Sequence, residues 1–148
     1  MEQDFKNKIC AFYPISKSDS LVPSIYFNVI HGHTRSNLIL NVILGGMDLS
    51  KKYFTLDLSI TRSDNKTIPN RHYKLDTTEM SKKGTIKKDN ITVGIYTLGP
   101  IVFEIDDHST FAYKASLVLK DDDGNICDSA HTWFLIRPDK DTNKNTDN

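Results

Sequence analysis

Apolar and polar residues alternate with a period of two along much of this chain. The clearest example lies at residues 53–61, where polar residues separate Phe54, Leu56, Leu58 and Ile60. A period of two places the apolar side chains on one face of an extended strand and the polar side chains on the other. No segment shows a helical period with comparable clarity. The pattern therefore predicts an all-β protein whose sheets have one buried face and one face in water.

Eight segments are predicted as strands, and turn-forming residues such as Pro14, Gly45–Gly46 and Gly99–Pro100 separate them. The predicted strands are residues 8–13, 24–30, 37–44, 53–61, 90–97, 101–105, 110–120 and 126–136. Seven or eight short strands with turns between them predict an antiparallel β-sandwich, with a barrel as the alternative. The architecture is similar to immunoglobulin-like or C2-like sandwiches. The Cys…Trp…Cys spacing of the immunoglobulin family proper is missing.

The 148-residue chain is predicted to form one domain over residues 1–138. The remaining residues, 139–148, are all polar or charged, and they are predicted to be a disordered C-terminal tail. The start of the chain has acidic residues and no apolar run of the kind that a secretion signal contains, which favours a cytoplasmic protein. No segment approaches the roughly 20 apolar residues that span a bilayer, so no membrane partner is expected.

Composition adds a hint of origin. The chain contains 15 Lys, 15 Ile and 11 Asn against four Arg. A/T-rich codons encode Lys, Ile and Asn, so this bias suggests a low-GC bacterium or one of its phages or mobile elements. The formal net charge is zero, with 19 basic and 19 acidic residues, and global electrostatics favour neither nucleic acid nor an anionic surface.

The linear motifs of the common enzyme classes are missing from the sequence. It contains no Gly-x-Ser-x-Gly elbow, no P-loop and no dinucleotide-binding glycine pattern. We therefore predict a non-catalytic protein that needs no cofactor. The two cysteines, Cys10 and Cys127, are predicted to be half-buried free thiols that act as small apolar residues.

Two groups of residues have the chemistry of metal ligands, but neither forms a complete site in the sequence. His31 and His33 are spaced so that two imidazoles could share a metal, yet they lie in a turn and no further ligand stands at a recognisable spacing. The run Asp121–Asp123 resembles the start of a calcium loop but lacks its later glycine and glutamate. A C2-type calcium site, in which Asp106 and Asp107 approach this run, remains an alternative. We predict no metal site and interpret the acids as turn residues in water.

Charge is unevenly distributed along the chain. Residues 62–88 contain eight basic and three acidic residues, and residues 104–123 contain six acidic residues and two lysines. The basic segment overlaps residues 69–89, which are predicted to be a long loop that could bind an acidic protein or nucleic acid. Its candidate binding residues are Lys82, Lys83, Lys87 and Lys88. The scarcity of aromatic residues and arginine in the segment makes nucleic acid the second choice.

The last predicted strand is apolar on both faces near Trp133 and Leu135. Either this strand is covered on both sides, or these two side chains lie on a surface patch that binds a protein. We predict a cytoplasmic protein-binding module that contacts another protein or a second copy of itself. A phage or mobile-element accessory protein that acts on a host factor fits this prediction. Nucleic-acid binding through residues 62–88 and a metal- or calcium-modulated binding domain are the alternatives.

Overall fold

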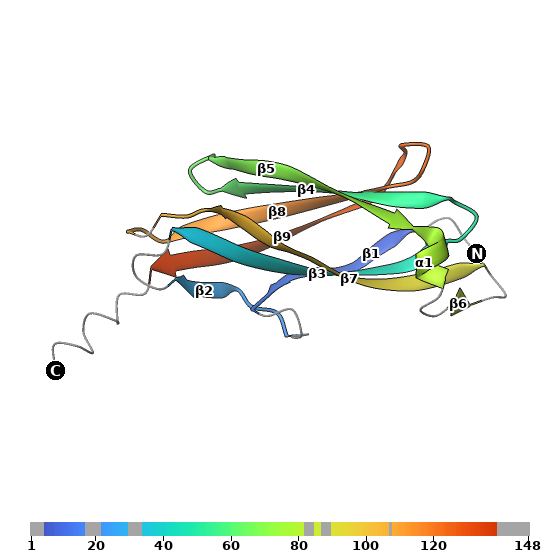
Figure 1. Ribbon diagram of the computed structural model, residues 1–148, viewed down its shortest axis with the longest axis horizontal. Helices are drawn as coiled ribbons and strands as arrows, with labels where there is room; N and C mark the ends of the chain where they lie inside the picture. The colour runs from blue at the N-terminus through green and yellow to red at the C-terminus, as the bar shows by residue number, and fades with distance from the viewer. Residues whose placement is uncertain are drawn as a thin grey trace.

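The computed structural model describes residues 5–16, 22–29, 34–81, 85–86, 90–106 and 108–138. Two sheets pack face to face in these residues, which confirms the predicted β-sandwich (Figure 1). The first sheet has the order β1-β3-β7-β6 and the second has the order β2-β9-β8-β4-β5. The strands of the first sheet are β1 (Lys8–Ile15), β3 (Arg35–Asp48), β7 (Ile91–Glu104) and β6 (Thr85–Ile86). Those of the second are β2 (Tyr26–Val29), β9 (Ile126–Pro138), β8 (Phe111–Lys120), β4 (Tyr53–Arg62) and β5 (Thr67–Asp76).

This strand order is that of an immunoglobulin-like sandwich. β1, β3, β7 and β6 take the places of strands A, B, E and D, while β9, β8 and β4 take those of G, F and C. β5 adds a strand beside β4. The pairing is antiparallel throughout, except that β2 runs parallel to β9. The N-terminal part of the chain therefore joins both sheets, through β1 and then β2.

The core lies between the sheets and is made of the inward-facing residues of the alternating strands. Tyr113 stacks on Phe134 with 5.2 Å between ring centroids, and Phe27 meets the edge of Phe134 at 5.9 Å. Phe54 of β4 and Leu40 of β3 are fully buried. Burial of this apolar surface is the main stabilising contribution to the fold.

Several predictions of strand boundaries are wrong. β1 continues through Pro14 to Ile15, and β3 continues through Gly45 and Gly46 to Asp48, so these residues do not end their strands. Residues 90–97 and 101–105 form one continuous strand, β7, in which Gly99 has a φ of 121° and the register with β3 shifts between Leu38 and Leu40. Residues 69–76, predicted as part of a loop, belong to β5 and pair with β4. The strand alternation is hard to see there because Pro69 and a bulge opposite β4 interrupt it.

A single short helix, α1 (Thr77–Ser81), follows β5 within the described residues. Asp76 accepts a hydrogen bond from the backbone N–H of Thr78 at 2.8 Å, so its side chain caps the first turn. No helix in the described part of the chain combines the length and the apolar character that crossing a membrane requires. The predicted tail, residues 139–148, lies outside the described residues.

Candidate functional site

Trp133 lies on the outer face of the five-stranded sheet. Its neighbours in β9, Phe134 and Ile136, point into the core, so the alternation of the strand turns Trp133 and Leu135 outward. Trp133 is 59% exposed and Leu135 is half-buried. Of the two interpretations of this strand, the structure therefore supports the surface patch. An exposed tryptophan is unusual, because this side chain is largely buried on average.

Cationic side chains flank the aromatic residues of this face. Lys114 is the cross-strand neighbour of Trp133, and its Nζ lies 5.9 Å from the centre of the indole ring. The guanidinium carbon of Arg137 lies 5.4 Å from the centre of the Tyr26 ring, and Tyr26 is 57% exposed. Distances below about 6 Å are those of cation–π contacts. We refer to Tyr26, Lys114, Trp133, Leu135 and Arg137 as the Trp133 surface.

A depression of about 260 Å³ adjoins Trp133. Ala112, Tyr113 and Trp133 contribute to its walls, together with Arg62 and the turn that follows β4. Arg62 is fixed there, because its guanidinium binds Asp64 and its carbon Cζ lies 4.0 Å from the centre of the Phe111 ring. The surface thus offers apolar and aromatic area beside cations.

The ion pairs of this face leave two of its cations available. Arg62 is neutralised by Asp64, and Lys120 is 2.9 Å from Asp57. Within the described ranges, no carboxylate forms an ion pair with Lys114 or Arg137. The Trp133 surface therefore has a local positive charge although the chain as a whole is neutral.

Two histidines of the same sheet form cross-strand hydrogen bonds. The Oγ of Ser116 lies 2.9 Å from Nδ1 of His131, and Nδ1 of His72 lies 2.6 Å from Oδ1 of Asp57. The hydrogen bonds from His72 and Lys120 lower the pKa of Asp57. A serine nucleophile also needs a group that orients its histidine and donors that stabilise the developing oxyanion. His131 has no carboxylate partner among the described residues, and its other close neighbour is the ring of Trp133, with 6.2 Å between centroids.

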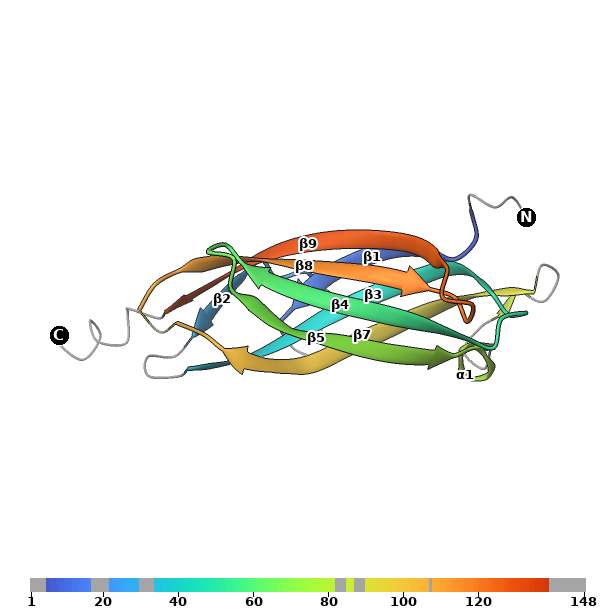
Figure 2. The same ribbon diagram turned by 90° about the horizontal axis from the view of Figure 1, so that it is seen from above.

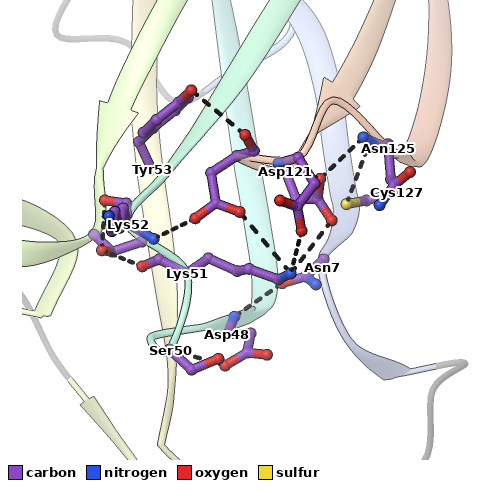
Figure 3. Close-up of polar contacts among 12 residues, drawn as sticks. Asn7, Asp48, Ser50, Lys51, Lys52, Tyr53, Asp121, Asn125 and Cys127 are labelled. Atoms are coloured by element: carbon purple, nitrogen blue, oxygen red, sulfur yellow. Dashed lines mark hydrogen bonds and ion pairs between the residues drawn. The ribbon is translucent and has the colours of Figure 1, made fainter.

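A second polar cluster lies at the β8–β9 turn, where Lys51 stands among three carboxylates (Figure 3). Its Nζ is 3.4 Å from Asp123, 3.7 Å from Asp121 and 3.9 Å from Asp122. The ammonium group therefore offsets part of the negative charge of these acids. Burial raises the pKa of Asp121, but hydrogen bonds from Asn125 and Asp123 and the charge of Lys51 outweigh it, and the pKa is lowered.

The structure contradicts the C2-type calcium alternative. Asp106 precedes β8, where it accepts hydrogen bonds from the backbone N–H groups of His108 and Ser109, and Asp121 follows β8. The two acids thus lie at opposite ends of this ten-residue strand (Figure 1). The other members of the predicted metal groups, His31, His33 and Asp107, lie outside the described residues.

A polar cavity of about 480 Å³ lies beside this turn. Lys6, Lys8 and Lys51 line it together with Asp48 and Asp121, so charges of both signs face it. Cys127 also lines it, and burial raises the pKa of that thiol. Cys127 is half-buried as predicted, whereas Cys10 is exposed, with its Sγ beside Gly45; both are free thiols.

The basic segment does not form a single loop. Arg62 and Lys66 flank the β4–β5 turn, while Arg71 and Lys74 lie on β5, where Nζ of Lys74 is 4.4 Å from the centre of the Tyr53 ring. The four lysines predicted to bind a partner, Lys82, Lys83, Lys87 and Lys88, lie outside the described residues. Of the predicted binding residues, the described structure therefore brings together Trp133 and Leu135.

Comparison with known proteins supports the fold alone. No protein-family model and no curated protein sequence matches the chain. A putative β-galactosidase from Bacteroides fragilis matches 82% of this chain over 15% of its own, with a TM-score of 0.51 and 16% identity. β-Glucuronidase 2 from Bacteroides uniformis matches 82% over 12%, with a TM-score of 0.52 and 9% identity. A glycosyl hydrolase family 2 member from Bacteroides cellulosilyticus matches 70% over 13%, with a TM-score of 0.51 and 11% identity.

Proposed function

We propose that this chain is a non-catalytic binding module that docks an acidic protein surface on the Trp133 surface. The observation that carries the proposal is the 59% exposure of Trp133 between Lys114 and the half-buried Leu135. Tryptophan, tyrosine and arginine are the residues that dominate binding energy at protein interfaces. Trp133, Tyr26 and Arg137 supply all three on one sheet face.

The geometry of the face favours a folded protein as the partner. The residues stand on three hydrogen-bonded strands, β2, β9 and β8, so their positions are fixed before binding. Preorganisation reduces the entropy lost when the complex forms. Lys114 and Arg137, which form no ion pair with another described residue, accelerate the encounter with an acidic surface and make it sensitive to salt.

The coding bias supports the biological setting of this proposal. Richness in Lys, Ile and Asn fits a protein of a low-GC bacterium, phage or mobile element, acting in the cytoplasm on a host factor. The glycoside hydrolases that share the fold are compared over 12–15% of their length, so their activities do not support an enzymatic role for this chain.

Affinity capture from a low-GC bacterial lysate tests the proposal, with and without nuclease. We expect the wild type to retain a stoichiometric protein that Trp133→Ala and Lys114→Glu lose. Ile126→Ala is the matched control, because Ile126 is equally apolar and 68% exposed but lies at the β8–β9 turn. Retention by Trp133→Ala would contradict the proposal, and loss of the captured material with nuclease would favour nucleic acid.

Fluorescence provides a second readout with the purified partner. Trp133 is the only tryptophan of the chain, so its emission reports on this surface alone. Docking removes the indole from water, and we expect a blue shift of the emission maximum that saturates with the binding isotherm. Binding without any shift would place the interface elsewhere on the molecule.

A further inference from the structure

The polar cavity beside the β8–β9 turn lies where three distant parts of the chain meet. Residues 6–8, Asp48 with Lys51, and Asp121 with residues 125–127 line it. Figure 2 shows the start of β1, the end of β3 and the β8–β9 turn gathered at one end of the sandwich. The volume of about 480 Å³ lies within the range of about 300–1,000 Å³ that is typical of small-molecule sites. The cavity is therefore large enough for a small ligand, which must itself be polar.

Hydrogen bonds hold the wall formed by residues 6–8. The backbone N–H of Asn7 donates to the carbonyl oxygen of Gly46 at 3.0 Å, and its Oδ1 accepts from the backbone N–H of Asp48 at 2.8 Å. Figure 3 shows Asn7 and Asp48 side by side. The backbone N–H of Ile9 then donates to Oδ2 of Asp128 on β9 at 2.8 Å. This segment is thus tied to both sheets, and its position is fixed before a ligand binds.

The two carboxylates of the cavity already have partners. Oδ1 of Asp48 accepts a hydrogen bond from the backbone N–H of Ser50 at 2.9 Å. Oδ1 of Asp121 accepts hydrogen bonds from the backbone N–H groups of Asp123 at 3.0 Å and of Asn125 at 2.9 Å. A carboxylate has about four acceptor sites, so each of these acids can still accept a hydroxyl group of a ligand.

Two of the three lysines that line the cavity have no carboxylate partner. Lys51 lies among the acids of the β8–β9 turn. Among the described residues, no carboxylate forms an ion pair with Lys6 or Lys8, and both lysines are half-buried. Two ammonium groups that face one cavity repel each other, and partial burial strengthens the repulsion. An anion bound between Lys6 and Lys8 would relieve it.

We propose that this cavity binds the phosphate monoester of a small polyol, such as a sugar phosphate, with its phosphate group at Lys6 and Lys8. A phosphate monoester carries about 1.5 to 2 negative charges at pH 7, which matches two ammonium groups. The hydroxyl groups of the polyol donate to the remaining acceptor sites of Asp48 and Asp121. None of the described residues that line the cavity is aromatic, so a nucleobase has no ring on which to stack.

This site is independent of the Trp133 surface. The depression beside Trp133 is lined by residues 112–114 near the start of β8, whereas Asp121 follows the other end of that strand. The two sites thus share no lining residue, and a ligand in the cavity leaves the Trp133 surface open.

Isothermal titration calorimetry of the full chain tests the proposal, with glucose 6-phosphate, glucose and inorganic phosphate as probes. We expect one equivalent of glucose 6-phosphate to bind, inorganic phosphate to bind more weakly, and glucose not to bind. Lys6→Gln and Lys8→Gln should each weaken the binding of glucose 6-phosphate by about tenfold or more, because each removes a hydrogen bond to a charged group. Lys66→Gln, the same change at an exposed residue of the β4–β5 turn, should bind like the wild type.

The two cysteines provide a second readout. Cys127 lines the cavity, whereas Cys10 is exposed and does not line it. Glucose 6-phosphate should slow the alkylation of Cys127 by iodoacetamide and leave that of Cys10 unchanged, as measured by mass spectrometry. Alkylation of Cys127 at the same rate with and without the probe would place any bound molecule elsewhere.

Three results of the titrations would overturn the proposal. The first is a wild type that does not bind glucose 6-phosphate, and the second is binding of glucose or gluconate as tightly as of glucose 6-phosphate. The third is Lys6→Gln and Lys8→Gln variants that bind as tightly as Lys66→Gln. Melting temperatures close to that of the wild type show that the variants are folded. Trp133→Ala should bind glucose 6-phosphate like the wild type, so failure of one proposal is distinguishable from failure of the other.

Discussion

The guanidinium of Arg62 binds both carboxylate oxygens of Asp64, with Nε and Nη2 each 2.7 Å from its oxygen partner. This bidentate pair holds the turn that borders the depression beside Trp133. The hydrogen bonds and charge of Arg62 lower the pKa of Asp64 from its ordinary 3.8 to about 2. Protonation of Asp64 would weaken this pair, so the position of the turn beside the Trp133 depression depends on pH.

The pH dependence of this pair has a defined sign. A carboxyl whose pKa is lower in the folded state stabilises the fold above its unfolded pKa, and that stabilisation is lost as pH falls through the folded value. For Asp64 the loss falls between pH about 4 and about 2. We expect NMR titration of the Asp64 carboxyl to give a midpoint near the lower value, and near its ordinary value in Arg62→Ala. A wild-type midpoint near 3.8 would show that the pair does not persist in solution.

The stacked pair of Tyr113 and Phe134 predicts a large loss of stability in the core. Both side chains are buried, and Phe134 also contacts Phe27. Phe134→Ala should lower the free energy of unfolding by about 3–5 kcal/mol, because a cavity replaces the ring. Phe5→Ala, at a 67% exposed phenylalanine, should change it by less than about 0.5 kcal/mol. Denaturant unfolding of the two variants measures the difference.

Thr77 connects α1 to the segment before β4. Its Oγ1 lies 2.6 Å from the carbonyl oxygen of Lys51 and 2.8 Å from that of Lys52, and the residue is 6% exposed. Thr77→Val removes this donor and should destabilise the protein by about 1–3 kcal/mol. Thr67→Val, the same change at an exposed position of β5, should be close to neutral. Equal thermal stability of the two variants would show that the buried hydroxyl contributes nothing.

The three carboxylates around Lys51 predict a response to calcium that depends on this lysine. The wild-type melting temperature should not change with calcium or EDTA, because the ammonium group of Lys51 already lies among the three carboxylates and offsets part of their charge. Lys51→Met leaves three carboxylates whose oxygens lie within 4.8 Å of one another, and it should lower the melting temperature through their repulsion. Calcium should then raise the melting temperature of this variant.

Lys52→Met provides the control, since Lys52 contacts the same turn only through its backbone N–H, which donates to Asp122 at 2.8 Å. Its melting temperature should match that of the wild type in all three solutions. A calcium-dependent rise in the wild type would mean that the ion competes with Lys51 for the cluster.

The parts of the fold with strong alternation were predictable from the sequence. Residues 53–61, 110–120 and 126–136 correspond to β4, β8 and β9 within two residues at each end, because one face of each strand packs against the core. β5 was not predictable in the same way. Only Ile68 and Leu75 of this edge strand are buried, and the bulge opposite β4 separates them by an odd number of residues, which breaks the period of two.

The candidate site was predictable only in part. The alternation of β9 assigns Trp133 and Leu135 to one face, but whether another layer covers that face depends on the arrangement of both sheets. The contact of Lys51 with Asp121–Asp123 joins residues about seventy positions apart, and no local sequence pattern predicts it.

The parallel pairing of β2 with β9 has a mechanical consequence. β1 begins at one end of the sandwich and β9 ends at the other, so a force that separates these two points acts along the long axis (Figure 2). Tension would pull β2 and β9 in opposite directions along their own axes. The hydrogen bonds between Tyr26–Val29 and the end of β9 would then be loaded in shear and share the load, instead of opening one after another. When the domain is stretched between β1 and β9, these hydrogen bonds should therefore raise the force that is needed to unfold it.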